Sequence, residues 1–167
     1  MENIATKDSW KNIPIKTPKK VNIFKIAPDL KLSFSKEQYL KIKNGLIPNE
    51  MEDKWFIYFE NDWLFFHRSW TGFGIYRAEI VTEMDNSEGR EYAIKDFYVE
   101  RNKKYYNYES DEYDLDVLLQ LIVWGLLELD VRKHFFDKYG TGEQSSIKMW
   151  SEFGQLIFSE KETINKE

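Results

Sequence analysis

The chain contains the continuous stretch KWFIYFE (residues 54–60), ND (61–62) and WLFFHR (63–68). We deduce the fold of the protein from this stretch. Aromatic and β-branched residues of this kind favour strands. Asn-Asp is a turn pair, and a loop of two residues suits a tight hairpin. The sequence therefore predicts an antiparallel hairpin with its strands at 54–60 and 63–68.

The two-residue loop also sets the register of this hairpin. Glu60 then opposes Trp63, and the pairs continue outward to Trp55 opposite Arg68. Because side chains alternate between the two faces of a strand, one face is apolar and should join the core; it carries Ile57, Phe59, Leu64 and Phe66. The other face is amphipathic and could line a groove; it carries Phe56, Tyr58, Trp63, Phe65 and His67. A slip of one residue would exchange the faces.

Further strands are expected on both sides of the hairpin. Runs at 73–82 and 91–100 are separated by short turns, and weaker patterns at 21–26 and 104–108 could add short strands. Ser35 and Gln38 form a capping-box pattern that opens a helix, which Gly45 and Pro48 should end.

The last third of the chain is typical of helices. Residues 115–129 are apolar on nearly every side, and acidic residues precede them, as suits the start of a buried helix. Helical patterns continue at 131–139 and 147–158. The predicted fold class is α+β: a four- to five-stranded antiparallel meander sheet packed against a buried C-terminal helix.

Length, charge and composition limit the classes of function that the protein can have. The chain has 167 residues and is expected to form a single domain, with 1–20 as a loose arm that Trp10 and Ile13 could pin and with 160–167 as a charged tail. A net charge of −5 argues against wrapping nucleic acid. The absence of cysteine, of an apolar leader and of a span of about 20 apolar residues indicates a cytoplasmic protein that does not cross a membrane.

The segment after the hairpin, HRSWTG (67–72), concentrates the polar chemistry. Arg68, Ser69 and Thr71 can donate hydrogen bonds to a phosphate or carboxylate, and Trp70 can stack on a ring. Trp55, Tyr58 and Tyr76, from the adjoining strands, complete this candidate ligand site together with His67. The alternative is a plain turn in which Ser69 and Thr71 bond their own backbone and Trp70 packs.

Catalytic and metal signatures are sparse. His67 and His134 are the only histidines, and neither lies in a metal-ligand or nucleotide-loop motif, so we predict no metal and no cofactor. His134 is expected near a helix end. If the protein were an enzyme, His67 would be the base and Arg68 the anion stabiliser.

Residues 105–113, YYNYESDEY, combine tyrosines with acids. Such a surface could mask a basic partner protein, and the alternative is a solvated turn that leads into the helix.

The segment KWFIYFENDWLFFHRSWTGFGIYR (54–77) resembles a signature of an uncharacterised group of small bacterial proteins, in which a W-F-x-Y strand and an F-H-R-S-W-T-G segment precede an I-Y strand. Related segments occur near ADP-ribose-processing modules. The resemblance implies a bacterial source and a nucleotide-like ligand, without an established catalytic role.

Two function classes follow from these patterns. The first is a non-catalytic binding protein that recognises a nucleotide-type ligand, with phosphate plus ring, or that acts as an immunity or anti-defence partner. The second is a small metal-free enzyme acting on a phosphate-bearing nucleotide or nucleic-acid substrate. A histidine without a visible catalytic partner favours the first class.

Overall fold

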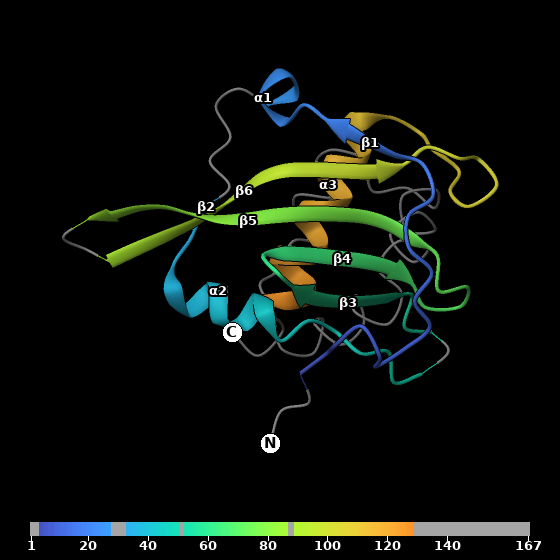
Figure 1. Cartoon of the computed structure of the whole chain (residues 1–167), viewed down its shortest axis with the longest axis horizontal. Helices are drawn as coiled ribbons and strands as arrows, with labels where there is room; N and C mark the ends of the chain where they lie inside the picture. Colours follow the sequence, from blue (N-terminus) through green and yellow to red (C-terminus); the bar gives the residue numbers. More distant parts are fainter. Residues whose placement is uncertain (1–3, 28–32, 51, 87–88, 129–167) are drawn as a thin grey trace, which may run out of the picture.

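The computed structural model describes residues 4–27, 33–50, 52–86 and 89–128 of the chain (Figure 1). At its centre, β3 (Trp55–Glu60) and β4 (Trp63–Arg68) form the predicted hairpin. Their register is the predicted one, from Glu60 opposite Trp63 to Trp55 opposite Arg68. Asn61 and Asp62 have φ values of 50° and 70°, the left-handed pair that a two-residue turn needs to match the twist of the strands.

Two longer strands continue the meander. β5 (Gly74–Asn86) pairs with β4, and β6 (Gly89–Glu100) pairs with β5, both antiparallel. Two short strands, β1 (Pro18–Val21) and β2 (Ser33–Phe34), also pair with β6. The result is a six-stranded sheet in the order β1-β6-β5-β4-β3, with β2 off this path. The α+β class with an antiparallel meander is therefore confirmed, and the N-terminal part of the chain adds strands at its far side.

Two of the weaker strand predictions were wrong. The strand expected at 21–26 ends at Val21, and Ile23–Ile26 form the short helix α1 because the Asn22 side chain accepts a hydrogen bond from the Lys25 amide at 3.1 Å and caps it. Residues 104–108 form no strand but turns and loop, since Asn102 O accepts from both the Tyr105 and the Tyr106 amide.

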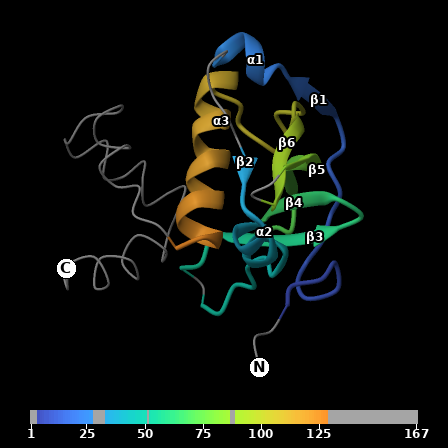
Figure 2. The ribbon, with the colours of Figure 1, turned by 90° about the vertical axis from the view of Figure 1, so that its left-hand side faces the viewer.

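The buried helix is confirmed, although it begins earlier than predicted. α3 (Asp111–Gln120) starts at the Ser110 cap, and the chain then widens into a π-helix, η1 (Leu121–Leu126). Figure 2 shows α3 standing along one face of the sheet. The helical patterns at 131–139 and 147–158, His134 and the tail at 160–167 lie outside the described residues.

α2 (Lys36–Lys43) confirms the helix predicted from its capping box. Ser35 Oγ accepts from the Gln38 amide at 3.2 Å, and Gln38 Oε1 accepts from the Ser35 amide at 3.0 Å. Gly45, with a φ of 66°, follows the end of the helix and allows the chain to turn toward β3. Its neighbour Leu46 exchanges main-chain hydrogen bonds with Ile57 at 2.8 and 2.9 Å, on the outer edge of the sheet.

The N-terminal segment (residues 4–17) differs from the loose arm that the sequence suggested. The Ala5 amide donates to Asn44 O at 2.9 Å, and Ile13 bonds Gly72 and Gly74 at 2.8 and 2.7 Å. In Figure 1 this segment runs up the right-hand end of the sheet to reach β1. Main-chain bonds to distant residues therefore hold it, in addition to the pinning by Trp10 and Ile13 that the sequence allowed.

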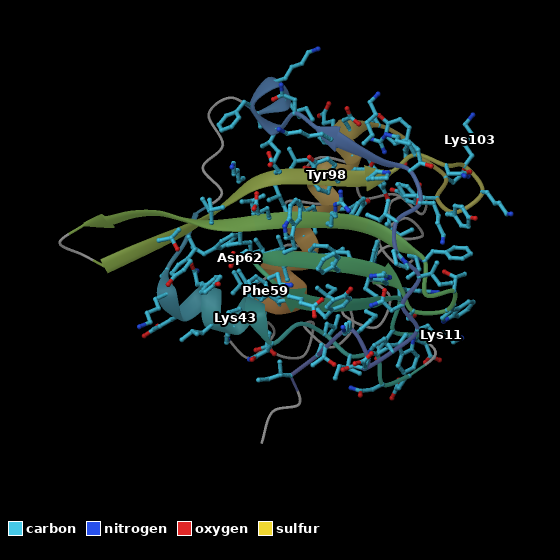
Figure 3. The ribbon with its side chains drawn as sticks, viewed as in Figure 1. Lys11, Lys43, Phe59, Asp62, Tyr98 and Lys103 are labelled. Atoms are coloured by element: carbon cyan, nitrogen blue, oxygen red, sulfur yellow. The ribbon has the colours of Figure 1, made fainter. Side chains whose placement is uncertain are left out.

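The two faces of the sheet have different environments. α3 covers one face, whose fully buried side chains include Trp55, Ile57, Leu64, Phe66, Tyr76 and Phe97. The opposite face, which we call the open face, carries one row across five strands through the register pairs: Tyr58, Phe65, Arg77, Tyr98 and Lys20. Figure 3 shows Tyr98 on this face, toward the viewer. The two predicted faces of the hairpin are thus confirmed.

Candidate functional site

The loop that follows β4 is a tight turn. The Arg68 amide donates to Phe73 O at 3.0 Å, and the Gly72 amide donates to Arg68 O at 2.8 Å. Gly72 has a φ of 80°, and a Cβ placed there would lie 2.7 Å from the Lys11 Cβ. Glycine therefore allows both the left-handed backbone and the close approach of the N-terminal segment.

His67 and Arg68 are neighbours in sequence, yet they belong to opposite faces of β4. His67 lies on the open face, 2% exposed, next to the rings of Phe56 and Tyr58. The Arg68 guanidinium lies 4.9 Å from the ring of Trp55, which belongs to the helix-covered face. Strand alternation separates the two groups, so an anion held by Arg68 would not meet His67 as a base.

A pocket of about 290 Å³ opens at the end of the sheet, beside the loop after β4. Its lining residues come from three separate parts of the chain: Lys54, Arg68, Trp70, Thr71, Phe73 and Tyr105. We call it the Trp70 pocket. Arg68, Trp70 and Thr71 are thus the members of the candidate set that line one cavity.

Trp70 is the most exposed ring among the residues that line this pocket. Its side chain is 59% exposed, which is unusual for a large apolar ring. The ammonium of Lys54 lies 4.5 Å from the centre of the Trp70 ring. Phe73 and Tyr105, which also line the pocket, meet edge to face with their ring centres 4.9 Å apart. The pocket therefore combines two cationic side chains with an open ring and an aromatic wall.

Ser69 and Thr71 have mainly structural partners. Ser69 is buried, and its hydroxyl donates to Asp53 O while its amide donates to Lys54 O at 2.9 Å. Thr71 Oγ1 accepts from the Phe73 amide at 3.1 Å, the local turn bond that the alternative interpretation expected. Trp70 does not pack as that interpretation required.

The remaining candidates lie elsewhere. Tyr58 lies on the open face, where its hydroxyl accepts from Asn12 Nδ2 at 3.0 Å. Tyr76 is 1% exposed in the core, with its hydroxyl donating to Asp114 Oδ1 at 2.7 Å. Trp55 stacks against Tyr76 with ring centres 5.7 Å apart and forms the layer beneath Arg68.

The N-terminal segment holds the loop from behind, and the sequence did not indicate this role. Trp10 Nε1 donates to Ser69 O at 2.7 Å, and Lys11 Nζ donates to Trp70 O at 3.1 Å. The Ile13 amide donates to Gly72 O at 2.8 Å. Figure 3 shows Lys11 at this end of the sheet. Three successive contacts therefore fix the main chain that presents Trp70.

Part of the acidic tyrosine segment is tied to the start of α3, while Asn107, Tyr108, Glu109 and Glu112 are exposed. Arg101 bonds Asp111 at 2.5 Å and lies 3.8 Å from the ring of Tyr108, whose hydroxyl donates to Asp111 at 2.8 Å. Tyr106 donates to Asp114, which is fully buried. These contacts tie the turn to the start of α3, and the prediction of a surface that masks a basic partner stays a prediction.

Comparisons of the chain with protein-family models, with curated proteins and with solved structures find no match. Within the described residues, no helix is long and apolar enough to cross a membrane. The same residues contain no group of three or more His, Asp or Glu side chains that could hold a metal ion. Function is therefore inferred from the geometry of the Trp70 pocket.

Proposed function

We propose that the protein binds, without transforming it, a small nucleotide-type ligand that carries one aromatic ring and one acidic group. The observation that carries the proposal is the Trp70 pocket, in which the Lys54 ammonium lies 4.5 Å from the exposed ring of Trp70 and Arg68 lines the same cavity. A cation that donates hydrogen bonds to a phosphate or carboxylate forms a stronger contact than a neutral donor does.

The aromatic side chains of the pocket support binding of the ligand's ring. An exposed indole offers a flat surface on which a base can stack, and such stacking tolerates different bases. The edge-to-face pair of Phe73 and Tyr105 adds apolar ring surface to the lining of the same pocket. Ring recognition and charge recognition therefore come from different residues of the same cavity.

The size of the pocket limits the ligand. A volume of about 290 Å³ lies just below the range for small-molecule sites, which is roughly 300–1,000 Å³. One ring with one acidic group fits such a volume better than a dinucleotide does. Nucleoside monophosphates are the simplest ligands with both parts.

The loop is held in place before any ligand arrives. Trp10, Lys11 and Ile13 bond the main chain of Ser69, Trp70 and Gly72. A preformed site loses less conformational freedom on binding, and its affinity rises accordingly.

The test is calorimetric titration of a panel of nucleoside monophosphates, the matching nucleosides and inorganic phosphate. Arg68→Gln should weaken nucleotide binding roughly ten- to a hundredfold, the equivalent of a charge-assisted hydrogen bond. Trp70→Ala should cost about 1–3 kcal/mol through lost stacking. Trp63→Ala is the matched control, since Trp63 also lies near a cation, Arg77, but on the open face.

His67→Ala addresses the catalytic alternative. The His67 ring is on the open face, so this variant should keep its affinity, and chromatography should recover the nucleotide unchanged from wild type and variant alike. Turnover that disappears in His67→Ala would restore the enzyme alternative. Equal affinity for nucleosides and nucleotides, or no saturable binding across the panel, would contradict the proposed function.

A further inference from the structure

A second cavity lies between the N-terminal segment and the open face. Its volume is about 130 Å³. The N-terminal segment contributes Asn12, Pro14 and Ile15 to its lining, and the sheet contributes Tyr58, Phe65, His67, Tyr76 and Arg77. We call it the His67 pocket.

The polar atoms of the His67 pocket have a defined pattern of donors and acceptors. His67 Nδ1 lies 2.9 Å from Gly72 O, and because a carbonyl only accepts, Nδ1 carries the hydrogen of the neutral ring. Nε2 is then left with a lone pair. Burial lowers the pKa of His67, which keeps the imidazole neutral near pH 7.

Tyr58 supplies a donor. Its oxygen already accepts from Asn12 Nδ2, so its own hydrogen is available for another partner. Burial raises the pKa of Tyr58, which keeps the phenol protonated.

Arg77 supplies the cation. Its guanidinium carbon lies 4.7 Å from the centre of the Tyr98 ring and 5.4 Å from the Trp63 rings, so aromatic contacts orient it. Its Nε–H is buried and has no hydrogen-bond partner. A buried donor without a partner is costly, and an oxygen placed beside it would remove that cost.

We propose that the His67 pocket binds a small oxoanion that also carries an O–H group, of which hydrogen phosphate is the simplest. Its anionic oxygens would accept from Arg77 and Tyr58, and its O–H would donate to His67 Nε2. The volume equals that of about four water molecules, which is enough for one tetrahedral group. The site is independent of the Trp70 pocket, because the two cavities share no lining residue.

The test follows the His67 imidazole nitrogens by NMR during titration of the full chain with sodium phosphate. The sequence has only two histidines, and His134→Gln removes the second signal for assignment. We expect a saturable change of the Nε2 shift. Arg77→Gln should weaken this response tenfold or more, since the anion loses its cation. Tyr58→Phe keeps the ring and should weaken it less.

Sulfate is the matched probe, because it is tetrahedral but carries no proton at neutral pH. It should bind more weakly than phosphate, since it has no hydrogen to give to Nε2. Arg68→Gln, which removes a cation from the other pocket, should leave the phosphate response unchanged. A response that is absent, that sodium chloride reproduces, or that survives in Arg77→Gln would overturn the site. Equal binding of sulfate and phosphate would overturn the role of the O–H group.

Discussion

The helix-covered face and the open face of the sheet both carry aromatic side chains, but these side chains differ in burial and in what they contact. On the covered face, aromatic side chains such as Trp55 and Tyr76 are at most 1% exposed and belong to the main core. On the open face, Trp63 and Tyr98 are half-buried and lie beside the guanidinium of Arg77. Burial also divides the open face itself, because Phe56 and Tyr58 pack with Ala5 in a second buried cluster, whereas Trp63 and Tyr98 stay partly accessible.

The largest expected difference between the faces concerns α3 and η1. Leu121 is fully buried against the covered face, so Leu121→Asp places an unpaired charge in the core and should lower the free energy of unfolding by about 3–5 kcal/mol. Leu40→Asp is the control, since Leu40 is 51% exposed on α2. Urea unfolding followed by circular dichroism measures both, and similar midpoints would contradict the buried helix.

Removing one tyrosine hydroxyl from each face compares the two faces through a smaller change in stability. Tyr76→Phe removes a donor from the buried carboxylate of Asp114 and should cost about 1–3 kcal/mol. Tyr98→Phe changes the same atom on the open face and should alter stability by less than about 0.5 kcal/mol. Equal losses in thermal unfolding would show that the two faces do not differ in this respect.

The smallest effect concerns pH. Burial lowers the pKa of His67 below its ordinary value of 6.5, so the unfolded chain binds this proton more readily than the folded one. Wild type should therefore lose stability as the pH falls through 6.5 toward the lowered pKa, and this contribution should be fully present above 6.5. His67→Gln should flatten that part of the profile in urea unfolding. An unchanged slope would mean that His67 is not the group responsible.

Local rules predicted the hairpin well, because its register depends on residues close in sequence. A loop of two residues leaves only one alignment of Trp55–Glu60 with Trp63–Arg68, and alternation then assigns each side chain to a face. The same alternation places His67 and Arg68 on opposite faces, because both lie within the strand predicted at 63–68. Lys54 was also within reach, since it precedes the register partner of Arg68.

Other parts of the site depend on contacts between distant segments, and no local pattern indicates them. Tyr105 reaches the Trp70 pocket from the turn after β6, and Trp10 reaches Ser69 across 59 positions of sequence. Main-chain bonds such as those of Ile13 leave no trace in composition, because every residue type except proline can form them. The polar arm was therefore expected to be loose.

The two outer strands of the sheet limit how another chain could join it. On β3, the main chain of Ile57 is already bonded both ways to Leu46, and Ser69 bonds Lys54 just before the strand begins. At the opposite side, β1 is four residues long and consists of a proline, two exposed lysines and Val21. Short, charged or covered edges discourage strand addition. Self-association into extended sheets is thus disfavoured at both sides, and a protein partner would have to engage side chains instead of the backbone.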